Sequence, residues 1–175
     1  MVTRLEWFKR RFAFELPIEM FANVVERLRG TPARLEDLTR SLSNEVLTRR
    51  DGDKWSIQEH AGHLLDLEEL WLKRLDDFEA SREQLSPADL TNRKTHEANH
   101  HANTIENILA VFRKERTEFV RRLDNYDEEL VQRTGLHPRL NMKIRVIDHI
   151  FFVAEHDDHH LARISELKRI FSDSK

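Results

Sequence analysis

The sequence of 175 residues has the length of one domain and contains four glycines, four prolines and no cysteine. So few turn-forming residues argue against a β-rich fold, and a chain without cysteine has no disulfides, no thiolate nucleophiles and no thiolate metal ligands. Its 29 basic and 32 acidic residues are mixed along the sequence and leave a net charge of −3, which provides no cationic field for nucleic acid. We therefore expect a single domain over residues 1–175 without a nucleic-acid partner.

The first predicted arm is interrupted near its middle. Residues 17–29 place apolar side chains at helical spacing and are followed by Gly30, which is typical of a helix C-terminus. Thr31 and Pro32 then fit a capping residue and a first helical position, and an apolar stripe continues to about residue 43. The pattern predicts a kinked or broken first arm.

A second helix is predicted over residues 56–80. Ser56 followed three residues later by Glu59 has the spacing of a capping box. Apolar side chains then recur every three or four residues. His60 lies on their face and His63 lies close beside it, so this face of the helix carries two imidazoles.

The remaining chain predicts two more helices with a long crossover between them. A third helix is expected over residues 94–123, with His101 on its apolar stripe and His96 and His100 exposed. Residues 125–141 contain a glycine and a proline and indicate an irregular crossover before a last helix over 142–171. Four amphipathic arms together favour an all-α four-helix bundle.

No segment has the pattern of a targeting signal or a membrane span. The chain begins with charged and aromatic residues, and no apolar stretch approaches the ~18 residues that a membrane helix needs. We therefore expect a cytoplasmic protein without a membrane partner.

Three histidines share one face of the last predicted helix. His149, His156 and His160 are seven and four residues apart, so at about 100° per residue they fall within a sector of about 60°. A histidine pair at i and i+4 can bind one metal ion, and His63 can approach the same bundle interior from the second helix. Three imidazoles from two helices predict a metal site with open coordination positions. Hydrogen-bonded core histidines are the alternative.

Two segments of the sequence resemble the DinB/YfiT-like superfamily of metal-binding four-helix bundles. Residues 54–64 (KWSIQEHAGHL) contain a Trp-Ser cap and a His-Leu pair, and residues 148–161 (DHIFFVAEHDDHHL) contain the His-x3-His spacing followed by leucine. Segments at residues 30–35 and 137–140 extend the resemblance over nearly the whole chain. By this resemblance the single ligand of the second helix is His63, and the paired ligands of the last helix are His156 and His160.

The resemblance also implies a cofactor, an assembly and a range of activities. The cofactor is one divalent metal ion, most often nickel or zinc, and the assembly is a homodimer. Family members with an assigned activity are similar to thiol transferases that use low-molecular-weight thiols, or are presumed metal-dependent hydrolases. The chain is therefore predicted to be a metal-dependent enzyme that activates a water or a small thiol against a small-molecule substrate. A non-catalytic metal- or small-molecule-binding stress-response protein is the alternative, followed by a metal-free bundle.

Three further histidines are candidates for supporting positions. His60 lies one turn before His63 and is the candidate catalytic base, although a core histidine bonded across the bundle accounts for it as well. His149 lies on the ligand face nearly two turns from the metal pair and is expected to line the pocket. His159 is turned about 100° from His160, which indicates a surface or supporting position.

Two acidic residues lie beside the predicted ligands. Glu59 is within reach of the second ring nitrogen of His63, although its capping box explains it without chemistry. Asp157 follows His156 and is a candidate hydrogen-bond acceptor or base, although acidic helix residues are usually solvated. Neither pattern decides between a supporting and a purely structural role.

The N-terminal segment carries four aromatic residues of its own, Trp7, Phe8, Phe12 and Phe14. An exposed aromatic arm of this kind favours burial against another surface. That surface is either a partner subunit or the bundle of the same chain.

Overall fold

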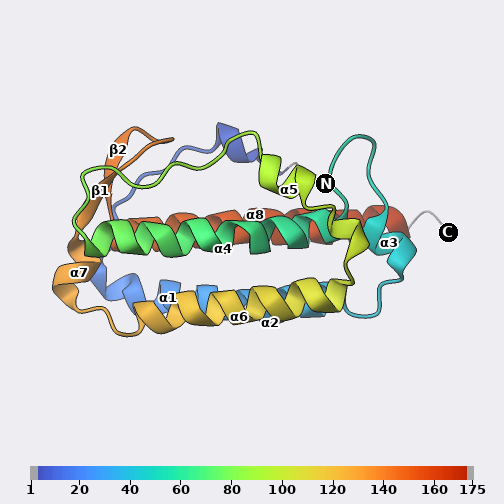
Figure 1. Cartoon of the computed structure of the whole chain (residues 1–175), viewed down its shortest axis with the longest axis horizontal. Helices are drawn as coiled ribbons and strands as arrows, with labels where there is room; N and C mark the ends of the chain where they lie inside the picture. Colours follow the sequence, from blue (N-terminus) through green and yellow to red (C-terminus); the bar gives the residue numbers. More distant parts are fainter. Residues whose placement is uncertain (1–3, 173–175) are drawn as a thin grey trace.

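The computed structural model describes residues 4–172 and contains four helical arms that pack side by side (Figure 1). The second arm packs against the third and the fourth, and the first arm packs against the same two. This arrangement confirms the predicted all-α four-helix bundle. The arms are α1 (Phe21–Arg29) with α2 (Thr31–Thr39), α4 (Ile57–Glu79), α6 (Ile105–Leu123) and α8 (Val146–Ser172).

Short elements connect these arms. Two antiparallel strands form a hairpin in which Gly135 pairs with Ile144. The first strand lies in the predicted irregular crossover, whereas the second occupies residues 142–145, so the last helix begins at Val146 and not at the predicted residue 142. A Cβ atom at Gly135 would lie 2.7 Å from Leu85, so the glycine allows this strand to approach the segment after α4. The short elements are η1 (Trp7–Lys9), η2 (Ile18–Met20), α3 (Asn44–Thr48), α5 (Arg93–Glu97), η3 (His100–Ala102), α7 (Glu128–Gln132), β1 (Thr134–His137) and β2 (Met142–Arg145).

The prediction is confirmed for the first arm and wrong for the third. The first arm breaks between α1 and α2 at Gly30, as the sequence predicts. The third arm was predicted to be continuous, but α5 and η3 precede α6 as separate elements. Asn92 and Asn99 adopt left-handed backbone conformations before α5 and η3, and Thr104 caps α6 by accepting a hydrogen bond from the backbone N–H of Asn107. Short polar side chains of this type tolerate the left-handed region and interrupt a helix locally.

The capping box of α4 is confirmed. The Ser56 side chain accepts a hydrogen bond from the backbone N–H of Glu59, and the Glu59 carboxylate accepts one from the backbone N–H of Ser56. Arg50 forms an ion pair with the same carboxylate. Glu59 therefore fixes the start of α4.

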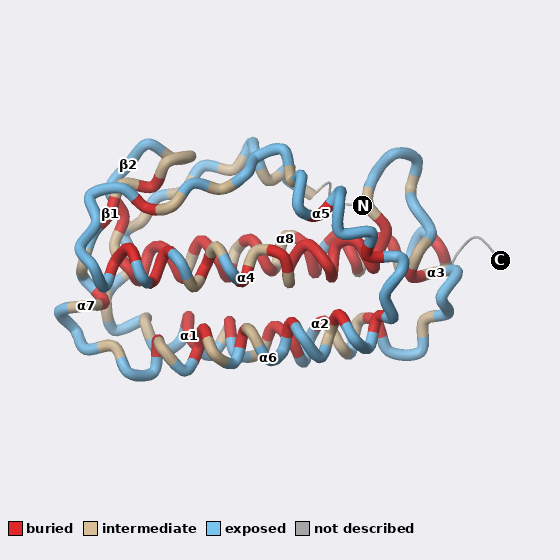
Figure 2. Tube along the Cα trace, viewed as in Figure 1, coloured by how far each residue is buried: buried red, intermediate tan, exposed pale blue. Residues whose placement is uncertain are grey.

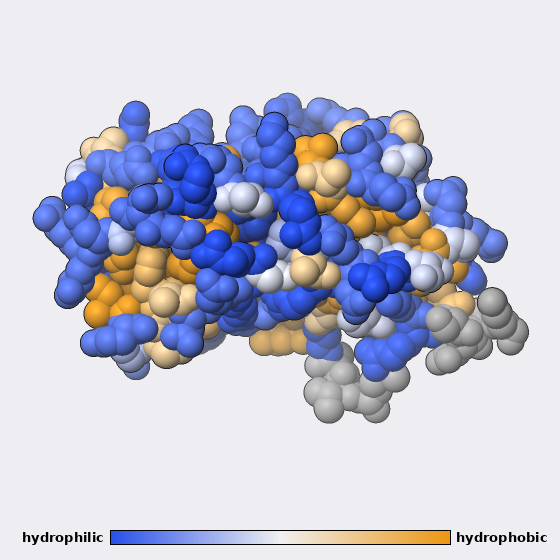
Figure 3. Space-filling model, turned by 90° about the horizontal axis from the view of Figure 1, so that it is seen from below, coloured by the Kyte–Doolittle hydropathy of each residue, from blue (hydrophilic) through white to orange (hydrophobic). Residues whose placement is uncertain are grey.

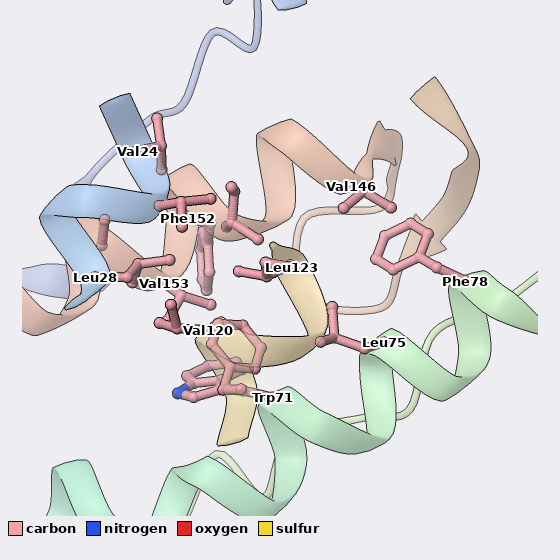
Figure 4. Close-up of a cluster of buried hydrophobic side chains, with 14 of the residues drawn as sticks. Val24, Leu28, Trp71, Leu75, Phe78, Val120, Leu123, Val146, Phe152 and Val153 are labelled. Atoms are coloured by element: carbon pink, nitrogen blue, oxygen red, sulfur yellow. The ribbon is translucent and has the colours of Figure 1, made fainter. Parts of the chain in front are cut away.

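Burial is concentrated along α4 and α8 (Figure 2). One side of this helix pair packs against the first arm and α6, and the opposite side is covered by the N-terminal segment that precedes η2 and by the segment between α4 and α6 (Figure 1). Two apolar clusters fill the bundle, and one of them includes Trp71, Leu75, Phe78, Leu123 and Val153 (Figure 4). Because both sides of α4 and α8 are covered, polar side chains on either side of these helices are also withdrawn from water.

The aromatic N-terminal segment folds back on its own chain. Trp7, Phe12 and Phe14 pack against the cluster shown in Figure 4, and the rings of Trp7 and Phe152 lie 5.1 Å apart. Phe8 is 63% exposed. The segment therefore covers the α4/α8 pair, which is one of the two uses that the sequence leaves open.

A buried ionic network connects all four arms. The guanidinium of Arg116 on α6 forms ion pairs with Glu68 on α4 and Asp157 on α8. Thr31 of α2 donates a hydrogen bond of 2.9 Å to Asp157, and Arg116 donates a long one of 3.5 Å to the carbonyl of Leu28 on α1. All three charged side chains are at most 1% exposed, so their mutual arrangement is shielded from solvent.

The outer face of the bundle is predominantly hydrophilic. Seen from the side of α6, charged and polar side chains cover most of the surface and hydrophobic patches are dispersed among them (Figure 3). Within residues 4–172, no helix combines the length and the apolar character needed to cross a membrane.

Candidate metal centre

Three histidines converge between α4 and α8. His63 comes from the second turn of α4, and His156 and His160 come from consecutive turns of α8. Each offers one ring nitrogen, and the three nitrogens lie within 4.8 Å of one another. The Nε2 atoms of His156 and His160 are 3.1 Å apart. When two imidazoles bind the same metal ion at about 2.1 Å, their ligating nitrogens lie roughly 3 Å apart. The spacing of this pair therefore fits one shared ion.

The centre lies on the outer side of the α4/α8 pair, away from α6 and the first arm. Sequence analysis placed it in the bundle interior, and the structure corrects this. The histidines border a cavity of about 360 Å³ that α4 and α8 form with the N-terminal segment, the segment after α4 and the loop after β1. Besides the three histidines, its lining includes Trp7, Trp55, Trp71, Arg74, Arg139 and Phe152. The expected open space is therefore present beside the three converging histidines.

A hydrogen-bond chain orients His63. Thr95 donates its hydroxyl proton to the carboxylate of Asp66 at 2.8 Å, so its oxygen can accept a hydrogen bond from Nδ1 of His63 at 2.9 Å. The proton is thereby held on Nδ1, and Nε2 keeps its lone pair for a metal ion. The Nε2 atom of His100 also lies 2.8 Å from the Asp66 carboxylate. Burial opposes the charge of Asp66, but hydrogen bonds from His100 and Thr95 hold its pKa below the usual value.

Sequence analysis missed this supporting chain. His100 was expected to be exposed, but it is only 5% exposed and packs against Gly62. A Cβ atom at Gly62 would lie 2.3 Å from the His100 ring, so the glycine beside His63 makes this contact possible. The one available signal was Asp66, three residues after His63 and hence on a neighbouring position of the same helix. His101 also departs from its predicted place on an apolar stripe, because it is exposed and bonds to the Ser56 hydroxyl.

His60 contacts one of the three converging histidines but is not part of that group. Its Nδ1 atom lies 2.8 Å from Nδ1 of His160, on the opposite side of that ring from His156. Burial lowers the pKa of His60 to about 3. The ring is therefore neutral at pH 7 and a weak base, so its geometry is best suited to orienting His160.

All three converging histidines are neutral at pH 7. Burial lowers the pKa of His63 to about 4, and it lowers those of His156 and His160 well below 6.5. Metal ions bind the unprotonated imidazole, so these rings present lone pairs without first losing a proton. In addition, Nδ1 of His156 is buried without a hydrogen-bond partner among the described residues.

Of the other two histidines predicted to support the site, one borders the cavity. His159 borders it, and its ring nitrogens lie 3.0 and 3.2 Å from Arg4. His149 was predicted to line the pocket, but it is fully buried between Trp71 and Phe78 and is absent from the cavity lining. Because it lies nearly two turns before His156 on α8, its ring packs in the apolar cluster and not beside the cavity.

The two acidic candidates serve the fold. Asp157 directs its carboxylate to Arg116 and Thr31 on the side of α8 opposite the cavity. Glu59 is occupied by Ser56 and Arg50 and also lies outside the cavity lining. Neither contacts a ring nitrogen of the three converging histidines among the hydrogen bonds of residues 4–172.

The fold and the converging histidines together define a helical bundle with three buried histidines that could hold a metal ion. The chain belongs to the DinB superfamily, whose sequence profile matches residues 27–164. This match confirms the family that the sequence resembles. Among curated proteins, none matches the chain at a significant level.

Two solved structures are similar to this chain. YfiT from Bacillus subtilis, described as a probable metal-dependent hydrolase with an unusual four-helix bundle topology, superposes with a TM-score of 0.78 and 20% sequence identity over 93% of this chain and 94% of that one. A mycothiol-dependent maleylpyruvate isomerase superposes with a TM-score of 0.65 and 9% identity over 85% of this chain. The present chain spans 60% of the isomerase chain. At these identities the likeness establishes a shared fold.

Proposed function

We propose that the chain is a metal-dependent enzyme that binds one divalent ion through His63, His156 and His160 and activates a water or a small thiol. The observation that carries the proposal is a set of three imidazole nitrogens within 4.8 Å beside a cavity of about 360 Å³. Three protein ligands with adjoining space are typical of catalytic metal sites, whereas structural sites are closed by a fourth ligand. Nickel or zinc and a homodimeric assembly belong to the same proposal by family resemblance.

The residues around the centre have distinct roles in this proposal. When bound, a divalent ion would lower the pKa of a water or thiol toward neutrality and so supply a nucleophile. Thr95 and Asp66 hold the tautomer of His63, and His60 holds the ring of His160. The aromatic side chains of the cavity wall provide apolar surface and leave room for a small substrate.

Hydrolysis and thiol transfer are both compatible with this centre. The description of YfiT as a probable metal-dependent hydrolase supports the first, and the mycothiol dependence of the isomerase supports the second. Both require an open position on the ion. Screening against ester or amide substrates and against small thiols with electrophilic acceptors distinguishes them.

A non-catalytic metal-binding protein is the second candidate. It would be favoured by a fourth protein ligand, and His60 is the nearest histidine able to supply one. In this structure Nδ1 of His60 instead contacts the Nδ1 of His160, and His60 is outside the group of three. The open set therefore favours the enzyme.

Elemental analysis of the tag-free protein tests the metal centre. After reconstitution with nickel or zinc we expect about one ion per chain in the parent and in the exposed control His96→Ala, and a loss of stoichiometric binding in His63→Ala and His156→Ala. Circular dichroism verifies that each variant is folded. A folded parent that retains no ion after reconstitution contradicts the proposal.

A second prediction concerns the hydrogen-bond chain behind His63. Asp66→Asn preserves the size of the side chain but removes the charge that holds Thr95 and His100. We expect metal affinity to fall about 10- to 100-fold, as is usual when a partner behind a ligand is removed. Titration calorimetry with zinc measures the change.

The matched control is Glu69→Gln on the same helix. Glu69 is 82% exposed and pairs with Lys94. The substitution therefore removes a nearby negative charge without changing the hydrogen bonds that connect Asp66 to His63. Equal zinc affinities for Asp66→Asn, Glu69→Gln and the parent would show that the orientation of His63 does not depend on Asp66.

A further inference from the structure

Two arginines face the cavity without a carboxylate partner. Arg74 of α4 and Arg139 of the hairpin loop both line it, and neither forms an ion pair with an acidic residue anywhere in residues 4–172. A guanidinium remains charged at neutral pH and is costly to bury without an anion. Such a pair is therefore a candidate binding site for an anionic group.

Arg74 is held rigidly with one end free. It is 1% exposed, its Nε donates to the carbonyl of Ser86 at 2.9 Å, and its Nη1 lies 3.1 Å from Nε2 of His137. Its Nη2 has no hydrogen-bond partner within the described part of the chain. Asp77 is the nearby opposite charge, but its carboxylate is engaged by the backbone N–H of Ser86 and by Arg82.

Arg139 is stacked among aromatic rings. Its Cζ lies 4.6 Å from the Phe8 ring centroid and 5.1 Å from that of Trp7, and Nη2 donates to the carbonyl of Trp7 at 3.2 Å. Its Nε and Nη1 are without hydrogen-bond partners among residues 4–172. Burial lowers its pKa, and no opposite charge counters that effect. Stacking leaves the edge of a guanidinium available for a carboxylate.

The acidic residues that border the same cavity are already occupied. Glu6 forms an ion pair of 3.0 Å with Lys9. Asp89 accepts hydrogen bonds from the hydroxyl and backbone N–H of Thr91 and from the backbone N–H of Arg93. Arg4, in contrast to the other two arginines of the lining, pairs with Glu166. Asp89 keeps its negative charge, because these donors are neutral, but it is exposed to solvent and forms no ion pair with an arginine of the lining. Among the three arginines of the lining, Arg74 and Arg139 are therefore the two without a carboxylate partner.

Each of these arginines shares a tryptophan neighbour with the histidine cluster. The Trp71 ring lies 5.4 Å from Cζ of Arg74 and 5.9 Å from the ring of His156. The Trp7 ring lies 5.1 Å from Cζ of Arg139 and 5.0 Å from the same histidine. A ligand with a short apolar or aromatic middle part can thus reach from the arginines to the cluster.

We propose that Arg74 and Arg139 form a carboxylate-binding subsite of this cavity. The substrate of the proposed metal centre would then be a small carboxylic acid whose reacting group lies one short apolar segment from its carboxylate. Only the position of the substrate's reacting group rests on the proposed function. The carboxylate subsite does not, because it consists of two arginine side chains of the protein. It also specifies a substrate class, which the three histidines do not.

Binding of benzoate and benzamide to the metal-stripped full chain tests the subsite. The two probes have the same shape and differ in charge, and removal of metal prevents the carboxylate from binding an ion. By titration calorimetry or ligand-observed NMR we expect benzoate to bind the parent at least about tenfold more tightly than benzamide, since charge-assisted hydrogen bonds exceed neutral ones. Arg139→Gln should reduce benzoate affinity to about that of benzamide, and Arg139→Lys should retain part of the difference.

The control is Arg113→Gln, which removes one arginine from the exposed surface, where Arg113 pairs with Glu36. It should leave benzoate affinity unchanged. Equal affinities of the parent for benzoate and benzamide, no saturable benzoate binding, or full benzoate affinity in folded Arg139→Gln would each overturn the subsite. If the chain prefers benzoate to benzamide but fails to bind metal, the subsite is supported and the metal centre is rejected. The two proposals can therefore fail separately.

Discussion

Replacing Arg116 with alanine is expected to lower the free energy of unfolding by about 3–5 kcal/mol, because it leaves the buried carboxylates of Glu68 and Asp157 without a counter-charge. Small domains have total stabilities of only about 5–15 kcal/mol, so this single change should bring the protein close to unfolding. Burial already raises the pKa of Glu68 to about 7 against the opposing charge of Arg116. Urea unfolding at pH 8, where both carboxylates are ionised in the unfolded chain, measures the loss.

A matched control lies three residues earlier on α6. Arg113 forms an ion pair with Glu36 at the surface, where such pairs contribute roughly 0.2–1 kcal/mol, so Arg113→Ala should change stability little. Combining Arg116→Met with Glu68→Gln and Asp157→Asn removes all three charges and should recover much of the loss. If Arg116→Ala costs no more than Arg113→Ala, the network does not hold the four arms together.

Helix ends and side-chain positions that depend on residues close in sequence could be predicted. The capping box at Ser56 and Glu59 fixes the start of α4 through neighbouring residues, and the break at Gly30 depends on the adjoining Thr31 and Pro32. The three converging histidines also follow helical spacing, since His156 and His160 are one turn apart on the same helix. The structure brings His63 to them because α4 and α8 pack side by side.

Features that depend on contacts distant in sequence could not be predicted. Asp157 lies beside a predicted ligand, but its partner Arg116 is 41 residues away on another helix. The break before α6 is accompanied by the left-handed backbone of Asn99, and the burial of His100 depends on the missing side chain of Gly62. The position of the site on the outer side of the α4/α8 pair depends on how two covering segments fold back, which periodicity does not indicate.

The metal-free protein is also expected to lose stability steeply as the pH falls below about 6.5. Burial lowers the pKa of His60 and His137 to about 3, and that of His63 and His159 to about 4, whereas an unfolded histidine titrates near 6.5. The unfolded chain therefore binds more protons than the fold between those values. The stabilising contribution of each neutral ring is fully present above 6.5 and is lost as the pH falls toward 4 and then 3.

The slope of stability with pH, and the pH range in which it occurs, distinguish the effect of the histidines from that of the carboxylates. Each extra proton taken up on unfolding reduces stability by about 1.4 kcal/mol per pH unit, so two such histidines would remove nearly 3 kcal/mol per unit. Carboxylates with lowered pKa act in the same direction only below about 4.5. Glu68 acts in the opposite direction between about 4.5 and 7, because its pKa is raised in the fold, but it is a single group.

Urea unfolding of the metal-stripped protein at pH 8, 7, 6 and 5 measures this dependence. Above 6.5 the free energy of unfolding should change little, and below it the slope should correspond to the uptake of at least two protons. His60→Gln, which can still bond to His160, should reduce that slope by about one proton while leaving the protein folded at pH 8. A free energy of unfolding that stays constant from pH 8 to 5 would mean that these rings remain solvated, and would remove the physical reason why they are ready to bind a metal ion at neutral pH.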